Sequence, residues 1–179
     1  MPQSFKNSDI NFEKIDGKNP YFYVINALPS LRMKILDIAC GREHKYQILS
    51  RELAKHHSVT GIDIECKSGG NNPKFIRASV EDFETKEKFD AVVSTYFFGY
   101  VTHDWATYGL NHTAKDYEVR IMKKIHGLLK PDGLSVHYMN EPWTLTVSDL
   151  ESLGFVVLKF PNPVDLFRVE DGLCVLKKR

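Results

Sequence analysis

The sequence predicts one α/β domain built on a doubly wound, mostly parallel sheet of seven strands, with helices on both faces. This prediction depends on seven short apolar segments and on amphipathic segments that alternate with several of them. Several of the short segments are apolar at nearly every position, which is typical of strands covered on both faces. The predicted strands are residues 34–38, 58–62, 74–77, 89–94, 134–139, 155–160 and 173–177.

The first helix is predicted upstream of the first strand. Asn19 and Pro20 are suited to the N-cap and the first helical position, and an apolar segment follows them and ends at Pro29. We therefore expect residues 1–33 to form an N-terminal extension with one short helix, followed by the α/β domain at residues 34–179.

Three further helices are predicted, over residues 45–55, 114–129 and 147–153. In the first of these, Tyr46, Leu49 and Leu53 share one face of the helix. The last begins after Thr146, which is a favourable N-cap. Residues 65–73 are short and rich in glycine and asparagine, so we expect a loop there in place of a crossover helix.

Composition excludes several classes of protein. The chain has 24 Lys and Arg against 23 Asp and Glu, so no basic surplus points to nucleic acid as the main partner. No apolar run is long enough for a membrane span, and the first residues do not resemble a targeting peptide. Cys40, Cys66 and Cys174 lack metal-site spacing, and an odd cysteine count fits a reducing compartment. We therefore expect a cytoplasmic protein without a metal site.

The turn after the first predicted strand carries the strongest chemical signal. Residues 35–41 read Ile-Leu-Asp-Ile-Ala-Cys-Gly, with one glycine and a carboxylate, Asp37, four residues before it. A turn that binds pyrophosphate would carry several glycines and no carboxylate. This turn is therefore suited to a ligand with a cationic amino group and no phosphate.

A second carboxylate ends the second predicted strand. Asp63 lies 26 residues after Asp37, where an acid can accept hydrogen bonds from both hydroxyl groups of a ribose. The two strand ends together indicate a ligand with a ribose, a cationic group and no diphosphate. S-adenosylmethionine meets this description.

The chain resembles the class I S-adenosylmethionine-dependent methyltransferases from about residue 34 to residue 160. Five segments carry the resemblance in the expected order: residues 36–41, 61–64, 75–83, 89–94 and 128–133. The resemblance implies S-adenosylmethionine as cofactor and S-adenosylhomocysteine as product. It also implies that the turn ending at Gly41 holds the methionine part, Asp63 the ribose, and Ser79 with Val80 the adenine.

The full set of positions that the resemblance implies for cofactor contact is larger. It comprises Asp37, Ala39, Cys40, Gly41, Asp63, Ile64, Ser79, Val80, Ser94 and Thr95. Two positions depart from the family pattern: Glu43 stands where a second glycine is usual, and Ser79 stands where an acid is common. These departures leave a second interpretation open, namely a degenerate fold that binds or regulates without catalysis.

Catalytic candidates are fewer, because the family has no fixed catalytic residue. His103 could act as a base, and His137 lies near the end of the fifth predicted strand. Residues 96–108 contain six aromatic side chains, which could line an apolar acceptor pocket. Since the chain lacks a basic surplus and an Asn-Pro-Pro-Tyr motif after the fourth strand, we expect a small-molecule acceptor. RNA methylation that uses the basic residues 177–179 is the remaining alternative.

Overall fold

A computed structural model describes residues 20–98, 114–139, 143–161 and 172–179 of the chain. The strands are β1 (Lys34–Ile38), β2 (Ser58–Asp63), β3 (Lys74–Arg77), β4 (Phe89–Thr95), β5 (Leu129–Tyr138), β6 (Phe155–Lys159) and β7 (Leu173–Lys178). The helices are α1 (Pro20–Asn26), α2 (Ile48–Leu53), α4 (Ala114–Leu128) and α5 (Val147–Ser152). The predicted base His103 lies outside the described residues.

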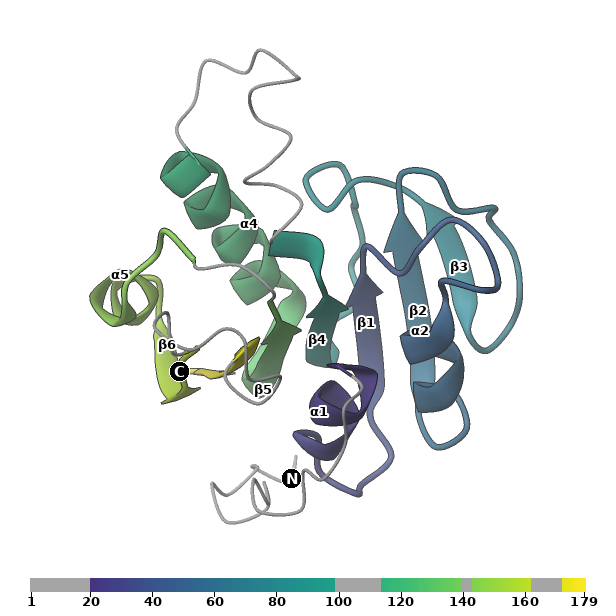
Figure 1. The fold of residues 1–179 in the computed structure, drawn as a ribbon, viewed down its shortest axis with the longest axis horizontal. Coiled ribbons are helices and arrows are strands. Elements are labelled where there is room, and N and C mark those ends of the chain that lie inside the picture. The colour runs from purple at the N-terminus through teal and green to yellow at the C-terminus, as the bar shows by residue number, and fades with distance from the viewer. Residues whose placement is uncertain (1–19, 99–113, 140–142, 162–171) are drawn as a thin grey trace.

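The strands form one sheet in the order β3-β2-β1-β4-β5-β7-β6 (Figure 1). The pairs from β3 to β5 are all parallel, whereas β7 runs antiparallel to both β5 and β6. The predicted mostly parallel, seven-stranded sheet is confirmed. The strand order reverses between β1 and β4, and ligands of doubly wound folds bind at such a switch point, beyond the carboxyl ends of the strands.

Helices cover both faces of the sheet, as predicted, and each face has its own apolar core. On one face, Val24 of α1 and Leu49 of α2 pack with Ile35 of β1. On the other face, Ile121 of α4 and Leu150 of α5 pack with strand side chains. Helix α1 therefore belongs to the same packed body as the strands.

Two boundaries differ from the prediction. The second helix begins at Ile48, because the backbone N–H groups of Tyr46 and Gln47 both donate to the Glu43 carbonyl in a preceding turn. Tyr46 consequently lies before the helix and is 47% exposed, so the prediction that it shares a helix face with Leu49 and Leu53 was wrong. Strand β5 begins at Leu129, five residues earlier than expected.

The early start of β5 comes from an irregularity in its pairing with β4. Phe89 pairs with Leu129 and Ala91 pairs with Leu134, so the Pro-Asp-Gly turn predicted from the sequence bulges within the strand. Asp132 adopts a φ of 61° in that bulge, which suits Asp better than most residues. The Pro-Asp-Gly sequence, which was expected to form a turn before the strand, therefore forms a bulge within it.

The loop predicted between β2 and β3 is confirmed, since no helix lies between Asp63 and Lys74. The Asn72 side chain fixes this loop. Its Oδ1 accepts from the Val59 N–H at 2.8 Å, and its Nδ2 donates to the carbonyls of Ala54 and His57, both at 3.0 Å. No helix in the described part of the chain is long and apolar enough to cross a membrane.

The N-terminal cap of α5 should contribute to the stability of the fold. Thr146 accepts from the Asp149 N–H, and the Asp149 carboxylate accepts from the Thr146 N–H, which together form a capping box. Thr146→Ala should lower the free energy of unfolding by about 1 kcal/mol in urea denaturation. Ser148→Ala, an exposed position within α5, is the control and should have little effect. Equal losses in both variants would contradict the assignment.

Candidate cofactor and acceptor site

The carboxyl ends of β1 and β4 lie side by side at one edge of the sheet, and the backbone there adopts unusual conformations (Figure 1). Positive φ angles occur at Ala39 (54°) and Gly41 (94°) after β1, and at Tyr96 (64°) after β4. Such conformations are costly for residues other than glycine, and they concentrate at functional sites. Their grouping at the switch point marks this edge as the candidate site.

Hydrogen bonds join the turn after β1 to the end of β2. The Cys40 N–H donates to the Ile62 carbonyl at 3.0 Å, and the Gly41 N–H donates to Asp63 Oδ2 at 3.0 Å. A Cβ on Gly41 would lie 2.7 Å from the Cβ of Tyr46, so the turn has no room for a side chain there. The two predicted cofactor-binding strand ends therefore form one unit.

Asp63 is held by two backbone donors. Its second oxygen, Oδ1, accepts from the Glu65 N–H at 2.9 Å, so one carboxylate bridges the β1 turn and the residues after β2. The carboxylate keeps acceptor capacity, because each oxygen has two lone pairs. Ile64, its neighbour in the chain, is 63% exposed.

Asp37 lies beneath this turn. Its side chain is buried, and Oδ2 accepts from the Ser50 hydroxyl of α2 at 2.5 Å. Burial raises the pKa of Asp37 to about 7; the Ser50 hydrogen bond lowers it, and the nearby charge of Asp63 raises it further. A buried carboxyl group of this kind is suited to meet a cationic amino group, which would favour its ionised form.

Glu43, where a glycine is usual in the family, does not obstruct the turn. Its side chain is 57% exposed and lies near the basic groups of Arg42 (4.0 Å) and Lys45 (3.9 Å). Glu43 is not among the described residues with positive φ, so its conformation does not require glycine. This geometry removes the steric reason for interpreting the fold as degenerate.

Ser79 begins the segment that the resemblance assigns to adenine. Its hydroxyl donates to Asp82 Oδ2 at 2.7 Å and accepts from the Asp82 N–H at 3.0 Å. Val80 is buried in the core. Asp82 was not among the predicted cofactor-binding residues, although its Ser-x-x-Asp spacing from Ser79 is typical of such local hydrogen bonds. Asp82 therefore provides a carboxylate next to the position where the family commonly has one.

Ser94 and His137 face each other across β4 and β5. The Ser94 hydroxyl lies 2.8 Å from His137 Nδ1, and the Ser135 hydroxyl lies 2.6 Å from Nε2. All three side chains are buried, and burial lowers the pKa of His137 to about 3. Both ring nitrogens already have partners, so this neutral imidazole offers no free base to a bound acceptor. Thr95, the next residue of β4, is half-buried.

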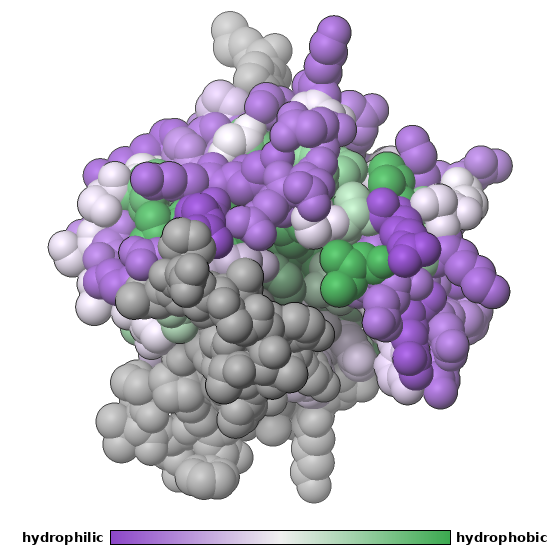
Figure 2. Space-filling model, turned by 90° about the horizontal axis from the view of Figure 1, so that it is seen from above, coloured by the Kyte–Doolittle hydropathy of each residue, from purple (hydrophilic) through white to green (hydrophobic). Residues whose placement is uncertain are grey.

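Aromatic rings form a cluster beside His137. The ring of Phe98 lies edge-to-face against His137 at 5.0 Å and against Trp143 at 4.8 Å, and Phe160 lies 6.4 Å from Trp143. Aromatic side chains were predicted after β4, but Trp143 and Phe160, which follow β5 and β6, were not predicted to join them. Figure 2, which looks onto the carboxyl edge, shows apolar surface near the middle of this face with hydrophilic residues around it.

These residues fit S-adenosylmethionine on structural grounds. The turn has a buried carboxyl group for a cation, a carboxylate for hydroxyl groups, and a glycine where a Cβ would clash. It lacks the glycine-rich loop that pyrophosphate requires. Among the described residues, no three His, Cys, Asp or Glu side chains are grouped as metal ligands would be.

Comparison with known protein families agrees with this geometry, since residues 18–154 match the methyltransferase domain family. The chain belongs to that family. It is an S-adenosylmethionine-dependent methyltransferase with the class I, Rossmann-like fold. A search of curated proteins found no significant match.

Solved structures share the fold at low sequence identity. An S-adenosylmethionine-dependent methyltransferase from Mesorhizobium loti gives a TM-score of 0.62 at 15% identity, over 90% of this chain and 99% of that one. A TehB-like methyltransferase from Corynebacterium glutamicum gives 0.61 at 19% identity, over 92% and 90% of the two chains. The Burkholderia thailandensis 1,6-didemethyltoxoflavin-N1-methyltransferase, bound to 1,6-didemethyltoxoflavin and S-adenosylhomocysteine, gives 0.57 at 16% identity, over 83% and 72%.

The role of Asp63 in the methyltransferase can be tested by calorimetric titration with S-adenosylhomocysteine. Asp63→Ala removes hydrogen bonds to a charged acceptor, each worth about 1.5–3 kcal/mol, so affinity should fall roughly 10- to 100-fold. Glu65→Ala is the matched control, because it removes an exposed acid but keeps the backbone N–H that Asp63 contacts. Unchanged affinity in the Asp63 variant would exclude it from the cofactor site.

Asp37 should make stability depend on pH. The unfolded carboxyl group ionises near pH 4 and the folded one near pH 7, so the contribution of Asp37 is fully present below about pH 4 and is lost as pH rises to about 7. Asp37→Asn removes this loss. Relative to wild type, the variant should therefore gain stability between about pH 5 and about pH 8, by at most about 2.7 kcal/mol. Urea unfolding of both proteins at the two pH values measures this gain, and a pH-independent difference would contradict it.

Proposed function

We propose that the methyltransferase transfers the methyl group of S-adenosylmethionine to a small molecule bound at the carboxyl edge of β4 and β5. The half-buried rings of Trp143 and Phe160, which pack on the buried Phe98 and His137, carry this proposal, because planar apolar walls are typical of pockets for small organic ligands. The Burkholderia enzyme, which is bound to 1,6-didemethyltoxoflavin, supports a small-molecule acceptor.

The C-terminal basic residues favour a small-molecule acceptor over RNA. Lys177 and Lys178 belong to β7, where Lys177 pairs with Asp132 at 2.9 Å. Lys178 donates to the carbonyls of His126 (2.8 Å) and Leu129 (3.0 Å). Side chains that are already engaged within the fold are poorly placed to form a phosphate-binding arm.

The reaction makes limited chemical demands on the protein. The sulfonium of the cofactor supplies an activated methyl group, and attack by the acceptor nucleophile breaks the carbon–sulfur bond and leaves S-adenosylhomocysteine. The turn at Ala39–Gly41 and the Asp63 carboxylate would fix the position of the donor. The aromatic cluster would orient the acceptor and exclude water, and such alignment accounts for much of the catalysis in group transfer.

Methyl transfer from tritiated S-adenosylmethionine in fractionated cell extract tests the proposal. Label should accumulate in the low-molecular-mass fraction, and Asp63→Ala should reduce that labelling. RNA and protein fractions serve as parallel acceptors in the same assay. Label that appears only in RNA or only in protein would overturn the small-molecule assignment.

A further inference from the structure

Two buried polar groups lack hydrogen-bond partners next to the aromatic cluster. Among the described residues, buried side-chain atoms without a partner are Glu118 Oε1, Trp143 Nε1 and Arg51 Nε. Arg51 lies apart, on α2, where its terminal NH2 group donates to Gln47. The other two atoms belong to neighbouring segments, because Thr144, which follows Trp143, donates both its N–H (3.1 Å) and its hydroxyl (2.5 Å) to Glu118 Oε2.

The two atoms are chemically complementary. Glu118 Oε1 is an acceptor when the carboxylate is ionised, and the indole Nε1–H of Trp143 is a donor only. A buried polar group without a partner costs about 1–3 kcal/mol, so native structures seldom keep one without a reason. A ligand that presents one donor and one acceptor would satisfy both groups.

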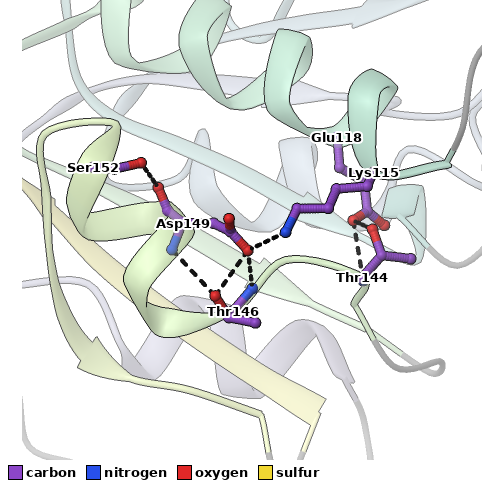
Figure 3. A network of polar contacts seen from close by, with 6 residues as sticks. All are labelled: Lys115, Glu118, Thr144, Thr146, Asp149 and Ser152. Atoms are coloured by element: carbon purple, nitrogen blue, oxygen red, sulfur yellow. Dashed lines mark hydrogen bonds and ion pairs between the residues drawn. The ribbon is translucent and has the colours of Figure 1, made fainter.

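The surroundings hold these buried groups in position. Glu118 is fully buried on α4, whereas Trp143 is half-buried and Thr144 is exposed. As Figure 3 shows, Lys115 of α4 pairs with Asp149 of α5 at 2.8 Å beside the Glu118–Thr144 contact. The segment that carries Trp143 is therefore fastened to α4 and α5.

Trp143 lies close to the carboxyl ends of β4 and β5, where the acceptor is proposed to bind. Trp143 packs edge-to-face on Phe98, which lies four residues after Ser94, and its ring centroid is 6.3 Å from that of His137. The serine bonds on both ring nitrogens fix the His137 imidazole, which in turn supports Phe98. Because Phe98 is 1% exposed and His137 is buried, a planar ligand would reach this cluster along the half-buried ring of Trp143.

We propose that Glu118 and Trp143 form the specificity subsite for the methyl acceptor, and that this acceptor is a planar nitrogen heterocycle carrying both an N–H donor and a hydrogen-bond acceptor atom, as in a lactam. The inference rests on the proposed small-molecule function and specifies the class of acceptor. A site with buried hydrogen-bonding groups rejects analogues that lack the matching group far more strongly than an apolar pocket does.

Calorimetric titration of the protein saturated with S-adenosylhomocysteine tests this subsite. The probes are the bicyclic lactam isocarbostyril and its N-methyl derivative, which has the same rings but no N–H. The lactam should bind, and its N-methyl derivative should bind at least about tenfold more weakly. Failure of the lactam to bind, or equal binding of the two probes, would overturn the proposal.

Three variants locate the effect. Glu118→Gln and Trp143→Phe should each weaken lactam binding about tenfold, because each variant removes one of the two hydrogen-bonding groups. Both changes preserve the local packing, since Gln can keep the Thr144 contact and Phe keeps an aromatic ring. Lys123→Ala, at an exposed position of the same helix α4, is the control and should leave lactam affinity unchanged. Affinity for S-adenosylhomocysteine should be unchanged in all three. Unaltered lactam affinity in both Glu118→Gln and Trp143→Phe would exclude the subsite.

Failure of this inference differs from failure of the proposed function. If low-molecular-mass products are labelled in extract but the lactam does not bind, the acceptor is small and belongs to another chemical class. If label enters only macromolecules, the proposed function itself is wrong. Should Glu118→Gln fail to fold, the Trp143→Phe variant and the matched pair of probes still decide the question.

Discussion

The candidate site depends on one carboxylate that accepts two backbone hydrogen bonds. Asp63 joins the turn after β1 to the residues after β2, and it fixes the direction of the Gly41 N–H. This link and the Cys40 N–H bond to the Ile62 carbonyl together hold the turn in which Ala39 has a positive φ angle, and so help to offset the cost of that conformation. The same carboxylate charge also raises the pKa of Asp37, after the larger effect of burial, so the two acids are electrostatically coupled.

The opposite side of the site is organised by polar contacts between α4 and the segment that precedes α5. Glu118 holds the backbone of Thr144, and the Thr146 cap then starts α5. The cofactor side is thus fixed mainly by backbone geometry, and the acceptor side by side-chain contacts. This division suits a family in which a constant donor meets different acceptors.

Much of the fold could be predicted from the sequence, because buried parallel strands are apolar on both faces and stand out as short segments. All seven strands were predicted for this reason, and the α5 cap was predicted from the N-cap residue Thr146. The errors arose where a local signal had two meanings. The Pro-Asp-Gly turn marked a bulge within β5, and the apolar spacing at Tyr46 belonged to a turn that Glu43 closes.

The candidate site was less predictable than the fold. Asp37 and Asp63 could be found because each lies at the carboxyl end of an apolar strand. Trp143 and Glu118 could not be found in this way, because they are far apart in the sequence and their unpartnered atoms become evident only once α4 packs beside the segment after β5. Asp82 was not predicted because it lies three residues after Ser79, the position where the family commonly has an acid, and only the structure shows the hydrogen bonds that join the two side chains.

The antiparallel insertion of β7 has a consequence for the order in which the fold is completed. In the sheet, β6 is an edge strand whose hydrogen-bonded neighbour is β7, and β7 in turn is the link to β5. During synthesis, residues 155–159 therefore emerge before the strand that will pair with them exists. Until residues 173–178 follow, the apolar side chain of Phe155 and the helix next to β6 have no sheet to join. The part of the sheet from β3 to β5 can assemble first, and the last strand to be made inserts between two elements that are already present.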